Sequence, residues 1–156
     1  MLANPSHHLR PFEFFECAGA FGVETCATLE RLFEVKNRWQ RRDAAFYKCS
    51  LRDVTGEIPQ TLLRDVLSRM REITSLPLME SVQVTAQQVE PGQSIGVHSD
   101  RPMRGYELVR LVLQLNAGSC PAHGGVLQLY ESPDRPSVVC LEPVYDFAFG
   151  FVLHED

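Results

Sequence analysis

Apolar residues in the first half of the chain follow two helical patterns. Over residues 24–35, apolar side chains recur at the i, i+3 and i+4 spacing of one helix face, at Leu29, Leu32 and Phe33. Pro59 suits the first position of a second helix, which Pro77 ends. One face of this second helix is apolar, with Leu62, Leu63, Val66, Leu67, Met70 and Ile73. Both patterns predict helices that pack against a core.

Short strands are expected beside these helices. The aromatic run at 12–15 predicts a strand, which a turn at 19–22 closes. Residues 44–51 predict another strand, and Gly56 breaks the chain after it. Two polar stretches are expected to be a solvated chain end and the solvated end of a helix, at His7-His8 and at Trp39-Gln40-Arg41-Arg42.

The second half of the chain is strand-like almost throughout. Residues 81–89 alternate apolar and polar side chains, which is typical of a half-buried strand. Glu90-Pro91-Gly92-Gln93 is a turn signal. Further strands are predicted at 94–98, 106–116, 125–131, 137–141 and 147–153. About six short strands without intervening helices indicate an antiparallel sandwich or barrel.

A chain of 156 residues fits a single domain. Residues 1–80 are expected to form a support region of helices and strands, and residues 81–156 a β-rich core. Hydrophobic residues make up 44% of the chain and charged residues 22%, which excludes the disordered and fibrous classes. The net charge of −5 argues against nucleic acid or an anionic membrane surface as a partner.

Neither a membrane span nor a secretory signal is expected. The longest apolar stretches are too short to cross a bilayer, and the N-terminus has no apolar run after a basic start. The five cysteines are irregularly spaced, and one stays unpaired under any disulfide scheme. We therefore expect thiols in a reducing cytoplasm.

His98 and Asp100 are the most informative residues of the sequence. They are two positions apart, so on an extended chain both side chains leave the same face. An imidazole nitrogen and a carboxylate oxygen on one face can occupy adjacent positions around a metal. With a second histidine they would form the two-histidine, one-carboxylate face of non-haem Fe(II) oxygenases. The spacing alone favours a surface turn, because such a tripeptide occurs by chance in many chains.

The elements around this pair form an ordered series. A Pro91-Gly92 turn precedes it, and a long apolar strand ending Leu113-Gln114-Leu115-Asn116 comes after it. A hairpin strand with the sequence Gly124-Gly125-Val126-Leu127-Gln128-Leu129-Tyr130 then follows. In these elements the sequence resembles the prolyl-4-hydroxylase-like branch of the Fe(II)/2-oxoglutarate-dependent dioxygenases. The resemblance covers residues 81–153, about half of the chain.

This resemblance implies a fold and an activity. The fold would be α+β but mainly β, with a double-stranded β-helix (jelly roll) core and the N-terminal helices packed outside it. His98 and Asp100 would hold Fe(II), which 2-oxoglutarate chelates. The reaction would use dioxygen to hydroxylate an unactivated C–H bond of a small-molecule, amino-acid or peptidyl substrate. Asp100 argues against the related halogenases, because these lack the carboxylate ligand.

The sequence departs from the family at its C-terminal end. The family's second histidine lies one strand further on, and an arginine that pairs with 2-oxoglutarate follows it. Here His154 is the one histidine in that region, and the last arginine is Arg135. Three readings stay open. His154 completes the metal site in an unusual register, the sequence stops before the ligand and before the last strands of the core, or the protein no longer binds iron productively.

Arg110 and Gln114 are the candidates for binding the co-substrate. Alternation along 106–116 places Arg110, Val112, Gln114 and Asn116 on one face and Leu111, Leu113 and Leu115 on the other. Gln114 matches the family's tyrosine position near 2-oxoglutarate. Arg110 would supply the charge of the missing arginine. The alternative for Arg110 is a surface ion pair with Glu107 or Asp100.

Two other functions stay open. One is a jelly-roll binding module that keeps the fold without a working site. The other is a cupin-like enzyme with another metal, held by His98, Asp100 and His123. Cys120 and His123 also have a zinc-like spacing, but a structural zinc needs four ligands, and a plain loop is expected there. The loop at 101–106 follows the proposed ligands, and its two arginines suggest an anionic substrate at the entrance.

Overall fold

The structure is a computed structural model that describes residues 4–35, 38–45, 47–100, 107–118 and 124–154. Its helices are α1 (Val23–Glu34), η1 (Thr55–Glu57, a 3-10 helix) and α2 (Gln60–Thr74). Its strands are β1 (Ser6–His8), β2 (Phe14–Ala18), β3 (Gln40–Ala44), β4 (Tyr47–Asp53), β5 (Thr85–Gln88), β6 (Val109–Gln114), β7 (Leu127–Leu129), β8 (Val139–Leu141) and β9 (Phe147–Val152). The protein is therefore mainly β, as the sequence predicts.

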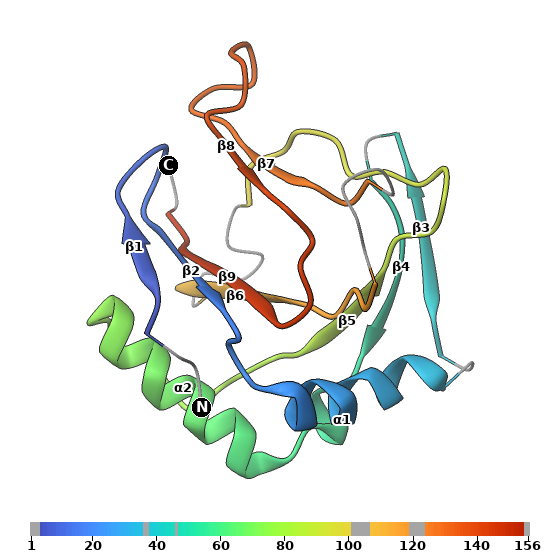
Figure 1. The fold of residues 1–156 in the computed structure, drawn as a ribbon, viewed down its shortest axis with the longest axis vertical. Helices are drawn as coiled ribbons and strands as arrows, with labels where there is room; N and C mark the ends of the chain where they lie inside the picture. Colours follow the sequence, from blue (N-terminus) through green and yellow to red (C-terminus); the bar gives the residue numbers. More distant parts are fainter. Residues whose placement is uncertain (1–3, 36–37, 46, 101–106, 119–123, 155–156) are drawn as a thin grey trace.

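The strands of the described residues form three antiparallel sheets and no closed barrel (Figure 1). The largest has the order β1-β2-β9-β6, the second the order β3-β4-β5, and β7 pairs with β8. The last strand, β9, lies between the N-terminal β2 and the central β6. The two predicted regions of the chain thus share one sheet.

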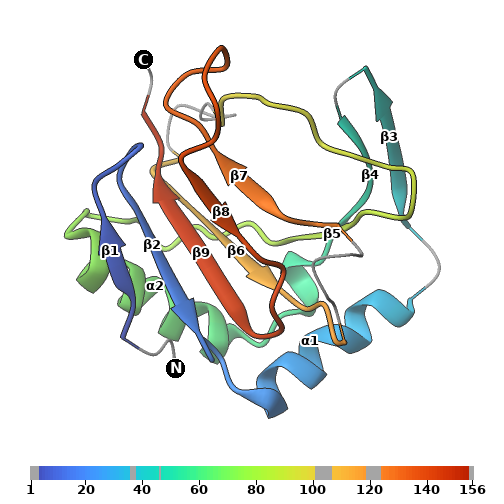
Figure 2. The same cartoon turned by 45° about the horizontal axis from the view of Figure 1, so that its top comes forward.

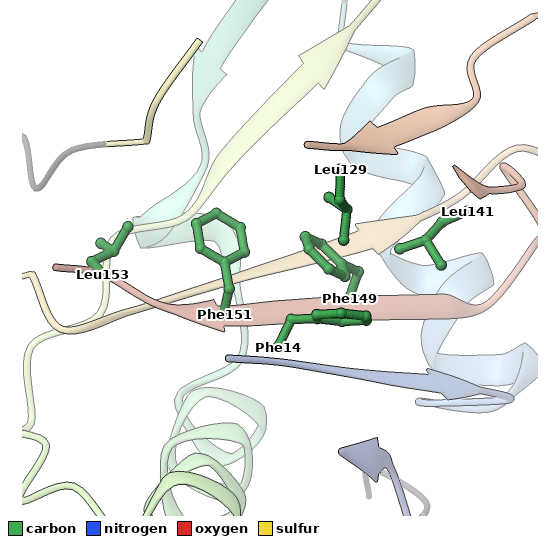
Figure 3. Packing of buried hydrophobic residues seen from close by; sticks show 6 residues of the cluster. All are labelled: Phe14, Leu129, Leu141, Phe149, Phe151 and Leu153. Atoms are coloured by element: carbon green, nitrogen blue, oxygen red, sulfur yellow. The ribbon is translucent and has the colours of Figure 1, made fainter. Parts of the chain in front are cut away.

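Each face of the four-stranded sheet covers its own hydrophobic cluster. Residues that pair across antiparallel strands share a face. On one face, Phe15 and Ala148 pack with Met70 of α2. On the other, the β2 and β9 phenylalanines pack with leucines of β7 and β8 (Figure 3), and the cluster comprises Phe14, Leu129, Leu141, Phe149, Phe151 and Leu153. The sheet is therefore the middle layer between α2 and the β7-β8 pair (Figure 2).

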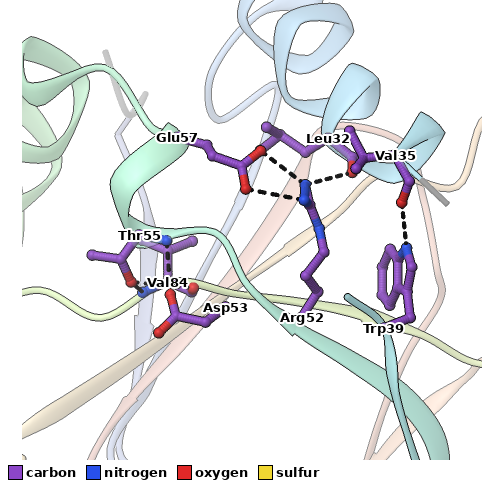
Figure 4. Close-up of polar contacts among 8 residues, drawn as sticks. All are labelled: Leu32, Val35, Trp39, Arg52, Asp53, Thr55, Glu57 and Val84. Atoms are coloured by element: carbon purple, nitrogen blue, oxygen red, sulfur yellow. Dashed lines mark hydrogen bonds and ion pairs between the residues drawn. The ribbon is translucent and has the colours of Figure 1, made fainter. Parts of the chain in front are cut away.

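A second, smaller core lies where the three-stranded sheet meets α1 and α2. Arg52 of β4 is only 3% exposed. Its guanidinium donates to both carboxylate oxygens of Glu57, each at 3.0 Å, and to the Leu32 carbonyl at 2.8 Å (Figure 4). The same arginine lies 6.0 Å from the centre of the Trp39 ring. A paired and hydrogen-bonded cation thus joins β4, η1 and the end of α1.

Both predicted helices are confirmed within two residues of their predicted limits. The predicted turn at 90–93 is also confirmed, since Gln93 N donates to Glu90 O at 2.9 Å and Gly92 has φ +83°. A positive φ in the third position of a turn that has proline second is the form that favours glycine. Among the described helices, none combines the length and the apolarity needed to span a membrane.

Two stretches assigned to solvent are instead strands. His7 and His8 belong to β1, which pairs with β2, and the His8 ring stacks on Phe14 at 4.5 Å. Gln40, Arg41 and Arg42 belong to β3, which pairs with β4 and is exposed along its whole length. Each strand lies at a sheet edge and is held by backbone hydrogen bonds to its neighbour, so neither strand needs an apolar face. Charged side chains are common on such edges.

Most predicted strands of the second half are shorter than expected, and 81–89, 125–131 and 137–141 shrink to β5, β7 and β8. Only Ile95 of 94–98 is paired, through a single bridge to Tyr47. The strand predicted for 106–116 is β6, six residues long, and its start at residue 106 lies outside the described residues. The first aromatic strand begins at Phe14 instead of Phe12, because its partner β9 sets its limits.

Gly150 is the tightest backbone position of the main sheet. A Cβ atom built there would lie 2.1 Å from Cζ of Phe15, the residue that pairs with it. We expect Gly150→Ala to lower the free energy of unfolding by about 1–3 kcal/mol through overpacking. Urea denaturation measures this change. Gly56→Ala is the control, because nothing lies within 4 Å of its added Cβ, and equal losses in both variants would contradict the account.

Asp146, from the far end of the chain, holds the turn that leads into α1. Its carboxylate accepts hydrogen bonds from Phe21 N and Gly22 N, both at 2.8 Å. We expect Asp146→Ala to cost about 2 kcal/mol or more, since two amides lose their acceptor. Asp65→Ala, at an exposed position of α2, should change stability by less than about 0.5 kcal/mol. Thermal and urea unfolding of both variants would check the difference, and a stable Asp146→Ala would contradict it.

Candidate functional site

The segment that carries His98 and Asp100 is held against β4. After the 90–93 turn the chain returns to this strand, where Lys48 N donates to Ser94 O at 3.0 Å and Tyr47 pairs with Ile95. The following residues, Gly96 to Asp100, leave the sheet and are partly exposed. The backbone contacts of Tyr47 and Lys48 thus fix the position at which the His98 segment starts.

The side chains of His98 and Asp100 converge. His98 Nε2 lies 3.5 Å from Asp100 Oδ1, and His98 Nδ1 lies 2.8 Å from Gly96 O. A carbonyl oxygen can only accept, so Nδ1 carries the hydrogen and donates it. In the neutral imidazole, Nε2 then presents its lone pair on the side of Asp100. About one third of each side chain is exposed, 33% for His98 and 35% for Asp100.

Arg110 joins the same group from β6. Its Nη1 donates to Asp100 Oδ1 at 2.5 Å, and its Nη2 donates to Glu107 Oε2 at 3.3 Å. Arg110 pairs across the sheet with Phe151, so it lies on the face that carries the phenylalanine cluster. The predicted alternation is therefore confirmed: Leu111 and Leu113 pack in the opposite cluster, with α2. These ion pairs with Asp100 and Glu107 are the ones expected if Arg110 is a surface residue that does not bind a co-substrate.

Gln114 lies at the other end of β6. Its side-chain oxygen accepts from Asn116 Nδ2 at 2.8 Å, and its carbonyl accepts from Asp146 N at 3.0 Å. It lies four positions along the extended strand from Arg110, a distance of about 13 Å. The two residues share a face, but the structure does not bring them to one small ligand. Sequence alternation gives the face of a residue and not its place along the strand.

His154 is exposed and follows the last hydrogen bond of the β6-β9 ladder, from Leu153 N to Leu108 O. It does not form a metal-binding group with His98 and Asp100. Within the part of the chain that the structure describes, no three histidine, cysteine, aspartate or glutamate residues lie close enough together to hold a metal ion. Cys120, His123 and the loop at 101–106 lie outside the described residues.

Tyr47 is a neighbour of the site that sequence reasoning missed. Its ring meets that of His98 edge to face, with centres 6.1 Å apart, and its hydroxyl donates to Gln87 Oε1 at 3.5 Å. Burial raises the pKa of Tyr47, and the nearby Cys49 adds to this. No motif marks this tyrosine, because 51 positions separate it from His98 and only the bridge to Ile95 brings them together.

A pocket of about 360 Å³ opens beside Gln114. Its polar lining comes from Gln87 and Gln88 at the end of β5, from Gln114 and Asn116 at the end of β6, and from Glu30 of α1. Tyr145 donates a hydrogen bond to this glutamate at 3.1 Å. The pocket and the His98 group are therefore two separate features that β6 connects.

Comparison with known proteins assigns no relative. No protein-family model, no curated protein and no solved structure matches this chain. The geometry of the described side chains is therefore the basis for any function.

The ion pairs of this site are expected to contribute little to stability. Arg110 is 30% exposed, so Arg110→Met should change the free energy of unfolding by less than about 1 kcal/mol. Arg52→Met is the matched comparison, because it removes a buried arginine with three hydrogen bonds and should cost at least about 2 kcal/mol. Urea denaturation separates the two, and a larger loss for Arg110 would show that this residue is structural.

Proposed function

We propose that the protein is a non-haem Fe(II)/2-oxoglutarate-dependent oxygenase that hydroxylates a C–H bond. The observation that carries this proposal is the convergence of His98 Nε2 and Asp100 Oδ1, 3.5 Å apart, with the imidazole oriented by a carbonyl. The fold of this proposal is a double-stranded β-helix with helices outside it. Its setting is the cytoplasm, in keeping with the thiols of Cys17, Cys26, Cys49 and Cys140.

The two side chains fit a metal of this kind. Nitrogen and carboxylate ligands lie about 2.0–2.2 Å from such an ion, so two adjacent octahedral ligand atoms are about 3 Å apart. The observed separation needs only a small closing movement. Metal-binding histidines usually donate their other ring hydrogen to a carbonyl or carboxylate, as His98 does to Gly96. His154 does not lie with this pair, and the described side chains offer no third protein ligand beside it.

Arg110 has two roles in this proposal. Its guanidinium fixes the Asp100 carboxylate next to His98. A carboxylate offers several lone pairs, so Asp100 can bind a cation and keep its arginine. The N–H groups of Arg110 that are not used for Asp100 and Glu107 also offer a positive charge to a carboxylate of 2-oxoglutarate. Gln114, about 13 Å further along β6, is left to contact the substrate end of the site.

The bound iron, 2-oxoglutarate and dioxygen supply the oxidising chemistry. In the overall reaction, substrate, 2-oxoglutarate and dioxygen give hydroxylated substrate, succinate and carbon dioxide. Of the protein's own residues, His98 and Asp100 would hold the iron, and Arg110 would orient the co-substrate. Tyr47 lies edge-on to the His98 ring.

Anaerobic titration of the whole chain with Fe(II) and 2-oxoglutarate tests this proposal. We expect a visible charge-transfer band from the chelate and succinate formation once dioxygen is admitted. Asp100→Ala should weaken Fe(II) binding at least about tenfold and abolish both signals. Asp134→Ala, at an exposed turn residue, is the control. A folded wild-type protein without the band would contradict the proposal.

A jelly-roll binding module without a working metal site is the second candidate. It is favoured by the finding that no third ligand lies near His98 and Asp100 among the described side chains. The same titration separates the two, because a binding module would show neither the band nor iron in stoichiometric amount.

A further inference from the structure

The pocket beside Gln114 combines one acidic side chain with several amides. Within its described lining, Glu30 is the charged residue. Four residues contribute side-chain amides, namely Gln87, Gln88, Gln114 and Asn116. The remaining lining is apolar and comprises Phe33, Val89, Leu113 and Leu115. Its volume of about 360 Å³ lies at the lower end of the range of small-molecule pockets, so the pocket suits a small polar ligand.

Glu30 has no cationic partner among the described residues. Its Oε2 accepts a hydrogen bond from the Tyr145 hydroxyl at 3.1 Å. None of the ion pairs of the described side chains includes it. Arg31 is the next residue of α1, but adjacent residues of a helix do not face each other. The partly buried carboxylate therefore keeps its charge without a counter-ion from the protein.

The side chains around Glu30 are neutral or acidic. Burial raises the pKa of Tyr145, and the hydrogen bond to Glu30 adds to this, so the hydroxyl keeps its hydrogen. Burial also raises the pKa of the Cys26 thiol to about 12. The carboxylate of Asp146 is close enough to act on both groups in the same direction. This end of the pocket therefore has a negative potential, which favours a cation.

The amides of Gln114 and Asn116 orient each other. Asn116 Nδ2 donates to Gln114 Oε1 at 2.8 Å. Gln114 Nε2 is therefore left as a donor for a ligand, and Asn116 Oδ1 is left as an acceptor. Gln87 and Gln88 are exposed and add two further amides. Donors and acceptors of this kind match the hydroxyl and carbonyl groups of a hydrophilic molecule.

Two adjacent residues hold the acidic and the amide parts of the pocket in place. Asp146 N donates to Gln114 O at 3.0 Å, and Tyr145, next to it, donates to Glu30. Residues 145 and 146 thus connect the end of β6 with α1. A pocket whose polar groups are held before binding loses less conformational entropy when a ligand enters.

We propose that this pocket binds a small hydrophilic primary amine, with its ammonium group at Glu30 and its hydroxyl or amide groups at Gln114 and Asn116. A carboxylate ligand is disfavoured, because the described lining holds no cation and Glu30 repels it. A purely apolar amine is disfavoured as well, because the amides would lose water without gaining a partner. This binding does not depend on iron or on the oxygenase proposal.

The test is a titration of the whole chain, without iron and 2-oxoglutarate, followed by nuclear magnetic resonance of its amide groups. Two amines are each compared with a counterpart in which a hydroxyl replaces the amino group: D-glucosamine with D-glucose, and glycinamide with glycolamide. The titration is done at about pH 6, where such amino groups are protonated. We expect the amines to shift the side-chain amide signals of Gln114 and Asn116 and to bind at least about tenfold more tightly than their counterparts.

The outcomes separate a pocket from a general attraction of cations to an acidic protein. Binding of one amine alone supports the proposal and tells whether hydroxyl or amide groups suit the pocket better. No shift at Gln114 and Asn116 with either amine, shifts spread over the surface, or equal affinity for amine and counterpart overturns it. Because iron is absent throughout, such a failure leaves the oxygenase proposal as it stands.

The Glu30→Gln variant tests the charge while it keeps the shape of the side chain. We expect the roughly tenfold preference for the amines to disappear in this variant. Glu24→Gln is the matched control, because it removes the same charge from an exposed position in the first turn of α1. It should keep the preference. A preference that survives in Glu30→Gln, or that is lost equally in both variants, overturns the role of Glu30.

The Asn116→Ala variant tests the amides at an exposed position. We expect the affinities for an amine and for its neutral counterpart to fall by the same factor, because the lost contact is to a group that both share. The preference for the amine should stay. Unchanged affinities in this variant would overturn the proposed placement of the ligand.

Discussion

The carboxylate of Asp146 is the interaction on which the arrangement of the sheets depends. The residue is 6% exposed and has φ +56°. Its side chain accepts from the amides of Phe21 and Gly22, its carbonyl accepts from Ala20, and its own amide donates to Gln114. One residue therefore joins the start of α1, the start of β9 and the end of β6, which are far apart in the sequence.

This junction fixes the two faces of β6. With β9 in register, the leucines of β6 face α2, and Arg110 faces the phenylalanine side. The same register therefore decides that Arg110, and not a leucine, lies beside Asp100.

Side-chain periodicity predicted much of this fold and less of the site. The helices, the 90–93 turn and the alternation of Arg110 with Leu111 could be read from the sequence, because each depends on neighbours within a few positions. β1 and β3 could not, since both are polar and are stabilised by the backbone of a distant strand. The pairing of His98 with Asp100 is local, whereas the contact with Tyr47 depends on a bridge that no spacing rule describes.

The loop formed by the 90–93 turn has a consequence for insertions and deletions. Gln88 pairs with Ser50 and Ile95 with Tyr47, so seven steps along one strand face three steps along the other, and four residues loop out. Because these four residues are unpaired, the turn can gain or lose a residue while the bridge between Ile95 and Tyr47 keeps the start of the His98 segment in place. Sequence change is therefore tolerated ahead of Ile95 and not at the bridge itself.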